Sequence, residues 1–226
     1  MGIVNSAGAK KLRVGVLISG RGSNLGALID AASAPDFPAQ IVSVISNRPG
    51  AGGLARAADA GIPTLVVDHT GFSSRQRFEQ ALTAHFEAAD VALVCNAGFM
   101  RILTTTFTER WHNRHLNIHP SLLPAFRGLD THGQVLASGA RITGCTVHLV
   151  REAMDAGPIV AQAAVPVLAG DTEQSLAARV LKAEHRLYPW ALALVASGAA
   201  RVRGECVEIS PTQQATDPPL FSPPLG

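Results

Sequence analysis

Short apolar runs alternate with helical patterns over the first hundred residues of this 226-residue chain. The runs are rich in Val, Ile and Leu, and they predict four strands, at 12–19, 41–46, 63–67 and 91–95. Apolar positions at helical spacing predict three helices in the intervals, at 24–32, 52–60 and 75–88. Strands separated by helices in this way indicate β-α-β units. We therefore expect an α/β fold built on a mainly parallel, Rossmann-like open sheet with helices on both faces.

The pattern becomes less regular after residue 113. The further elements expected are a strand at 114–118, a proline-rich loop at 120–128, strands at 142–150 and 159–167 joined by a loop at 151–158, and a long helix at 173–196. Asp171 or Thr172 is the expected cap of that helix, and Gly198 marks its end.

One domain accounts for most of the chain, because no internal repeat and no change in composition divides it. We expect a catalytic domain over residues 12–198, a flexible leader over 1–11, and a partly disordered C-terminal extension over 199–226. The last 16 residues hold five prolines and no periodicity, which is typical of a disordered tail.

Charge and hydrophobicity narrow the class of partner. The net charge is +2, from 19 basic and 17 acidic residues, which does not suggest the basic face of a nucleic-acid binder. No uninterrupted apolar run approaches the ~20 residues of a membrane-spanning helix, so we expect a soluble protein. Small-molecule substrates and a monomer or homodimer are expected, without nucleic acid or membrane.

The three cysteines, Cys95, Cys145 and Cys206, are far apart and form no C-x-x-C pair. This spacing suggests neither a disulfide framework nor a cysteine zinc site. Cys95 and Cys145 lie in apolar runs, where buried and inert thiols are expected. A reducing, cytoplasmic location follows.

A glycine-rich turn, GRGSN (20–24), lies between the first strand and its helix. Backbone N–H groups converge in such a turn and the helix N-terminus adds partial positive charge, so phosphate is the natural ligand. Ser23 and Asn24 can each add a side-chain hydrogen bond. A tight turn with a helix cap is the structural alternative. NAD is disfavoured because the second strand ends in SNR (46–48) without the acidic residue that holds the ribose, although Arg48 leaves NADP open.

A second group of polar residues ends the strand predicted at 114–118. Asn117 and His119 lie on the same face of a strand, because side chains alternate. Pro120 then stops the strand and leaves His119 at the carboxyl edge of the sheet, where open α/β folds bind ligands. Asn can donate to a developing oxyanion, and His can donate or shuttle a proton. A polar strand end with a loop-anchoring histidine is the alternative.

Asp155 lies in a tight turn, MDAGP (154–158), where aspartate often only caps the backbone. It gains a chemical role if the fold brings it beside His119, where it can orient and charge-stabilise the imidazole. Sequence spacing does not reveal that contact.

Histidine spacing also raises a metal alternative. His112, His115 and His119 have helical spacing, but the strand-like LNIHP segment argues against one shared helical face, so we expect no metal. His148 alternates with Thr146 in an apolar strand and is either a core histidine or part of the site.

Six segments together make the pattern specific. They are VGVLISGRGSNLGALIDA, ISNRPGAGGLARAADAGIP, AGFMRIL, NIHPSLLPAFRGLDTHGQ, TGCTVHLV and MDAGPIVAQAAVPV. In this order they resemble the phosphoribosylglycinamide formyltransferases, the folate-dependent transformylases of purine synthesis, over about residues 12–198. NIHPSLLP with a later DAGPI is shared by the wider group of enzymes that use 10-formyltetrahydrofolate. Arg127-Gly128 is closer to the loop of methionyl-tRNA formyltransferases.

The resemblance implies a formyltransferase fold and metal-free formyl transfer from 10-formyltetrahydrofolate to the amine of glycinamide ribonucleotide. The catalytic trio matches Asn117, His119 and Asp155. The loop for the ribonucleotide phosphate matches Gly22, Ser23 and Asn24, and an acidic contact to the glycinamide substrate matches Glu184. Folate contacts are implied for Arg75, Met100, Arg101, Ile102, Leu103 and Asn117. Arg21 departs from the small or polar residue that is usual between the two glycines.

Overall fold

The computed structural model describes residues 10–210 and residue 222. Most of the expected leader and almost all of the expected proline-rich tail therefore lie outside the described residues. Within the described part, seven strands form one sheet: β1 (Leu12–Ile18), β2 (Ala39–Ser46), β3 (Thr64–Val66), β4 (Leu93–Asn96), β5 (His115–His119), β6 (Ile142–Leu149) and β7 (Ile159–Pro166).

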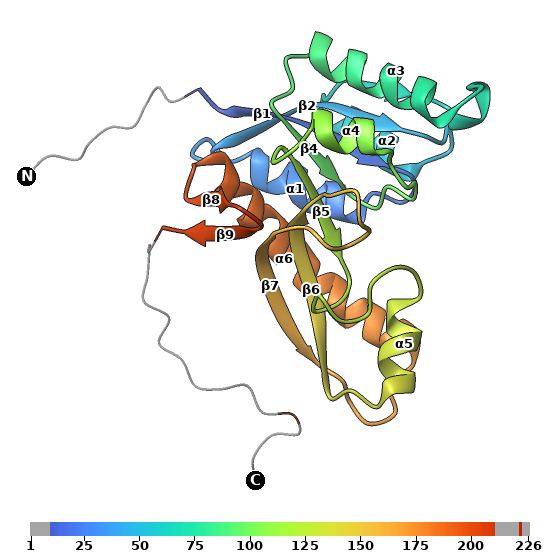
Figure 1. The fold of residues 1–226 in the computed structure, drawn as a ribbon, viewed down its shortest axis with the longest axis vertical. Coiled ribbons are helices and arrows are strands. Elements are labelled where there is room, and N and C mark those ends of the chain that lie inside the picture. The colour runs from blue at the N-terminus through green and yellow to red at the C-terminus, as the bar shows by residue number, and fades with distance from the viewer. Residues whose placement is uncertain (1–9, 211–221, 223–226) are drawn as a thin grey trace, which may run out of the picture.

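The strand order is β3-β2-β1-β4-β5-β6-β7, with the long sheet running through the centre of the molecule (Figure 1). Neighbours from β3 to β5 pair in parallel, whereas β6 is antiparallel to β5 and β7 is antiparallel to β6. The prediction of a mainly parallel α/β sheet is confirmed. The order also brings β1 and β4 together at the centre, so the chain reverses direction across the sheet at this point, where open α/β folds bind ligands.

Helices cover both faces of the sheet. The helices are α1 (Ser23–Ala32), α2 (Gly52–Asp59), α3 (Arg75–Ala88), α4 (Thr105–Arg110), α5 (Thr131–Ser138) and α6 (Glu173–Ala196), with a short 3₁₀ turn at His69–Gly71. Side chains of α1, α2, α5 and α6 join one apolar cluster, and those of α3 and α4 join the other. Strand β1 contributes side chains to both clusters, because Val16 and Ile18 face the first and Leu17 faces the second.

The long helix α6 begins where the sequence predicts. Thr172 is its cap: the Thr172 hydroxyl accepts from the Ser175 N–H at 3.2 Å, and the Thr172 N–H donates to the Ser175 hydroxyl at 3.0 Å. Asp171, the other expected cap, instead pairs with Arg179 at 2.7 Å. No helix in the described part of the chain is long and apolar enough to cross a membrane.

Besides the 3₁₀ turn at His69–Gly71, two helices and one hairpin were not predicted from the sequence. The helices are α4 and α5, of six and eight residues, too short to give a clear periodic signal. The hairpin, of β8 (Ala200–Arg203) and β9 (Cys206–Ile209), lies within the expected extension. Gly204, with φ of 60°, opens its two-residue turn, and Glu205 pairs with Arg151 at 3.0 Å.

Candidate functional site

The glycine turn connects β1 to α1 and packs against the start of α2. Gly22 has φ of 72°, and a Cβ at this position would lie 2.6 Å from the Cα of Gly53. The Gly53 N–H also donates to the Gly20 carbonyl at 3.1 Å. Only glycine combines this backbone conformation with so close an approach. The N-termini of two helices therefore meet at one turn.

The first backbone donors of α1 have no partner within the described residues, whereas the Gly53 N–H of α2 donates to the Gly20 carbonyl. Among the described residues, neither α1 nor α2 has a side-chain hydrogen bond at its N-cap, Gly22 and Ala51 respectively. The first N–H groups of a helix need a partner, and the two helix dipoles place partial positive charge beside them. The turn is thus built to bind an anion through its backbone.

Asn24 and Glu184 form a buried pair beside this turn. The Asn24 amide Nδ2 donates to Glu184 Oε2 of α6 at 2.7 Å. Burial raises the pKa of the Glu184 carboxyl, and the hydrogen bond from Asn24 partly opposes that rise. Within the described residues Asn24 Oδ1 has no hydrogen-bond partner. The amide is committed to Glu184 and does not point to an anion, so the pair presents acceptors that suit a hydroxyl or an amine.

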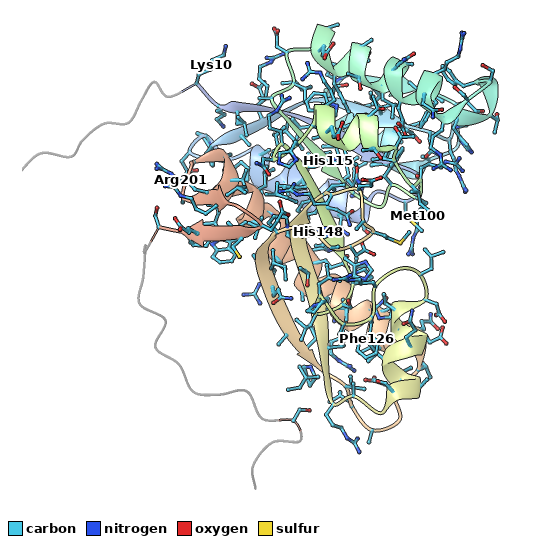
Figure 2. The ribbon with its side chains drawn as sticks, in the orientation of Figure 1. Lys10, Met100, His115, Phe126, His148 and Arg201 are labelled. Carbon is cyan, nitrogen blue, oxygen red and sulfur yellow. The ribbon has the colours of Figure 1, made fainter. Side chains whose placement is uncertain are left out.

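Asn117 and His148 face each other across β5 and β6. The two residues are paired in register, and Asn117 Nδ2 lies 3.1 Å from His148 Nε2. His148 Nδ1 lies 3.1 Å from the Leu149 carbonyl oxygen, so it carries a proton and Nε2 accepts from Asn117. Burial lowers the pKa of His148, which favours this neutral form. His148 therefore fixes the orientation of the Asn117 amide, and Figure 2 shows it at the centre of the molecule.

His119 lies between two oxygen atoms. Its Nε2 is 2.9 Å from the Phe126 carbonyl oxygen, and its Nδ1 is 3.4 Å from Asp155 Oδ2. Its two nitrogens therefore face a backbone carbonyl on one side and a carboxylate on the other. The predicted meeting of His119 and Asp155 therefore occurs, across 36 positions of sequence.

The loop between β6 and β7 holds Asp155 rigidly. Asp155 has φ of 50°, a left-handed conformation that Asp and Asn tolerate better than other non-glycine residues. Its Oδ2 accepts from the Gly128 N–H at 2.9 Å, and its Oδ1 lies 3.7 Å from His148 Nε2. A Cβ at Gly157 would lie 1.8 Å from the Leu149 carbonyl oxygen, so only glycine fits there. Asp155 thus touches both histidines of the site.

The segment after β4 carries four of the residues to which the resemblance assigns folate contacts. Met100 and Ile102 are 62% and 60% exposed, Arg101 is exposed, and Leu103 packs against the apolar cluster of α3 and α4. Arg75 is exposed in the first turn of α3. Exposed apolar side chains on a loop, flanked by basic groups, suit a flat ligand with an acidic end.

A groove of about 400 Å³ begins at Asp155. Leu123, Pro124 and Pro158 line it on the sheet side, and β9 closes it on the other. The hairpin that the sequence placed outside the catalytic domain therefore forms one wall of a groove that reaches the site.

The histidines considered as metal ligands are His112, His115 and His119. His115 and His119 are on β5, and burial lowers the pKa of His115 to about 3 while its Nε2 lies 2.9 Å from Asn96 Oδ1. No group of three His, Cys, Asp or Glu side chains that could hold a metal occurs in the described residues. Cys95 and Cys145 are buried, which raises the pKa of both thiols to about 12 and matches the expectation of inert thiols.

Sequence reasoning left the role of His148 open and gave none to Ser19 or Glu79, whose contacts are described below. The sequence signal for His148 was a polar residue within an apolar strand, and the structure pairs it in register with Asn117. Glu79 stands between Phe78 and Leu82 on the apolar face of α3, where an acidic residue is unusual.

Known proteins match nearly the whole folded part of the chain. Residues 12–192 match the formyl transferase family. The chain is 42% identical over 191 residues to phosphoribosylglycinamide formyltransferase of Escherichia coli (strain K12), which covers 84% of this chain and 90% of that protein. It is 53% identical over 199 residues to trifunctional purine biosynthetic protein adenosine-3 of Gallus gallus. That match covers 88% of this chain but only 20% of the relative, so the chain spans about a fifth of its length.

Solved structures agree with this assignment. The structure of phosphoribosylglycinamide formyltransferase from Brucella melitensis is 55% identical with a TM-score of 0.80, and covers 84% of this chain and 97% of that one. Glycinamide ribonucleotide transformylase 1 from Symbiobacterium toebii is 47% identical with a TM-score of 0.86, and covers 88% and 94%. By sequence and by fold, the chain belongs to the formyl transferase family, alongside its phosphoribosylglycinamide formyltransferases.

Proposed function

We propose that this chain transfers a formyl group from 10-formyltetrahydrofolate to the amine of glycinamide ribonucleotide, a step of purine biosynthesis. One observation carries the proposal beyond family membership. Asn117, His119 and Asp155 come from two different segments and form one contact cluster, with His148 bound to Asn117. This cluster supplies the donors and the carboxylate that formyl transfer needs.

The chemistry joins the amine nitrogen to the formyl carbon, breaks the bond from that carbon to N10, and moves one proton from the amine to N10. The amide of Asn117 and protonated His119 stabilise negative charge on the formyl oxygen. Asp155 holds the imidazolium and relays the proton. His119 Nε2 lies 2.9 Å from the Phe126 carbonyl oxygen in this structure, so donation from this nitrogen to the formyl oxygen requires that contact to break.

The ribonucleotide side of the site uses the turn at Gly22. The uncapped start of α1 supports binding of its phosphate through backbone N–H groups, including those of Ser23 and Asn24. Glu184 and Asn24 Oδ1 are acceptors for its hydroxyl or amine donors. In this arrangement backbone N–H groups bind the phosphate, and side chains bind the uncharged part of the substrate.

The folate side uses the segment 100–103, with Asn117 at its inner end. Exposed Met100 and Ile102 support contact with an apolar ring, and Arg101 and Arg75 support contact with an acidic tail. The reaction as proposed needs no metal. Free, buried Cys95 and Cys145 favour a reducing, cytoplasmic compartment.

The test is a turnover assay with purified protein, a 10-formyl folate analogue and glycinamide ribonucleotide. We expect deformylated folate and formylated ribonucleotide in equal amounts, measured by absorbance and by mass spectrometry. A parallel reaction without the ribonucleotide separates transfer from hydrolysis. Deformylation that does not depend on the ribonucleotide would replace transfer with hydrolysis, and no deformylation at all would refute the proposal.

A further inference from the structure

The segment between β4 and α4, residues 97–104, has no regular secondary structure to hold it in place. Phe99 and Leu103 pack into the apolar cluster of α3 and α4, whereas Met100 and Ile102 between them are mostly exposed. Figure 2 shows Met100 at the edge of the molecule, away from His148. Two polar attachments add to this packing and act on the backbone at either end of the exposed part.

Ser19 provides the first attachment, at the beginning of the segment. The Met100 N–H donates to the Ser19 hydroxyl oxygen at 2.8 Å, and the hydroxyl donates to Asn47 Oδ1 at 2.6 Å. The Ser19 N–H also donates to the Gly98 carbonyl at 3.2 Å. Ser19 is 6% exposed and directly precedes the glycine turn. Ser19 therefore follows β1 directly and holds the start of the segment.

Glu79 of α3 provides the second attachment, at the end of the segment. Its side chain is 3% exposed, and Oε1 accepts from the Thr104 N–H at 2.9 Å. Oε2 accepts a short hydrogen bond from the Thr104 hydroxyl. Burying a carboxylate is costly unless its oxygens are bonded, and here both are bonded to one residue. Two hydrogen bonds to one carboxylate restrict the position of Thr104 more than one hydrogen bond would.

We infer that Glu79 and Ser19 are positioning residues for the folate subsite, which hold residues 100–103 at both ends so that Met100 and Ile102 stay exposed as a platform for the ring. This inference rests on the proposed function. Neither residue touches the reacting atoms. Both act through the backbone of the loop, at Met100 and at Thr104.

The position of Thr104 at the start of α4 allows a purely structural role for Glu79, and the test must separate the two. A structural role lowers stability and the active fraction without a preference between substrates. A positioning role weakens folate and spares the ribonucleotide. The readouts are therefore the KM for each substrate, the Kd of a 10-formyl folate analogue by calorimetry, and Tm.

Glu79→Gln keeps the size of the side chain but loses one acceptor, and Thr104→Val removes the hydroxyl donor. We expect each to raise the KM and Kd for folate by about 10-fold, as for loss of a hydrogen bond to a charged group, with the ribonucleotide KM within about 2-fold. The double variant should be little worse than either single one. Thr104→Ser, which keeps the hydroxyl, should restore folate binding.

Glu87→Gln is the matched control. Glu87 also joins α3 to α4, through Arg110 at 2.8 Å, but lies far from the segment along both helices. Unchanged folate KM in this variant, together with a raised one in Glu79→Gln, supports the inference. Equal loss for both substrates, or a folate Kd that stays at the wild-type value, overturns it.

The wild-type protein separates this inference from the proposed function. Wild-type formyl transfer with unaltered folate binding in the Thr104 and Glu79 variants overturns the positioning role alone. Absence of formyl transfer and of folate binding in the wild type overturns both. If Glu79→Gln does not fold, Thr104→Val against Thr104→Ser decides, because the Thr104 hydroxyl makes no cap bond to α4 and donates to Glu79 instead.

Discussion

The glycine turn and the β5–β6 seam differ in which groups they present to a ligand. At the turn, backbone groups face outward and glycine is needed only so that α1 and α2 approach closely. At the seam, which we define as Asn117, His119, His148 and Asp155, four side chains contact one another and the backbone only supports them. Substitutions at the turn should therefore change binding through shape, and those at the seam should change turnover through charge and protons.

The seam gives the largest expected effect. Asp155→Asn keeps the size of the side chain and suits the left-handed backbone, but it removes the negative charge opposite His119. We expect kcat to fall by about 10² or more, with both substrates still bound. The double variant with His119→Ala should be little worse than the worse single variant. Steady-state kinetics and calorimetry measure this. Near wild-type turnover would refute the role of Asp155, and strictly additive losses would refute the coupling.

The turn offers a matched pair of glycines. Gly22→Ala puts a Cβ 2.6 Å from the Gly53 backbone at a positive φ, whereas a Cβ at Gly20 meets nothing within 4 Å. We expect Gly22→Ala to raise the ribonucleotide KM by about 10-fold with little change for folate, since a displaced turn loses its anion contacts. Gly20→Ala should behave as wild type. If both variants, or neither, raise the ribonucleotide KM, the turn does not act through close approach.

Two buried histidines, His148 of the seam and His115 on β5, should also dominate the pH dependence of stability. Burial lowers the pKa of His115 from 6.5 to about 3, and lowers that of His148 as well. Below pH ~6.5 these histidines bind protons in the unfolded chain but not in the folded chain. Their contribution to the free energy of unfolding is therefore fully present above this pH and is lost as the pH falls toward 3. The loss approaches about 1.4 kcal/mol per pH unit for each such histidine.

Urea unfolding between pH 7.5 and 4.5 measures this slope. His115→Gln should lower stability at pH 7, because the bond to Asn96 changes, and should flatten the pH dependence. An unchanged slope in this variant would mean that the acid sensitivity does not arise at His115.

Much of the fold follows from local pattern. The buried strands and the long helices α3 and α6 carry strong periodicity, and Thr172 is a recognisable cap. The helices α4 and α5 and the β8–β9 hairpin depend on packing against the rest of the chain, which a local window does not contain. For these short elements tertiary contacts decide the structure.

The candidate site divides in the same way. Gly22 and Asn117 lie in local motifs whose chemistry can be read from neighbouring residues. The contact of Asp155 with His119 was expected only from the family resemblance, because sequence spacing does not show which residues of separate loops meet. Ser19 and Glu79 accept from the backbone N–H groups of Met100 and Thr104, partners that residue type does not reveal, although an acidic residue on the apolar face of α3 is a signal for Glu79.

The unusual backbone of the Asp155 loop has a consequence for the timing of catalysis. A left-handed aspartate, a glycine pressed against the end of β6, and the bond from Gly128 hold the carboxylate in one place before substrate arrives. The strain and lost entropy of that arrangement are incurred once, when the chain folds, and not in each catalytic cycle. Stability and turnover are therefore linked at this loop: a substitution that relaxes the backbone, such as Asp155→Gly, would make folding easier while leaving the chemistry without its fixed charge.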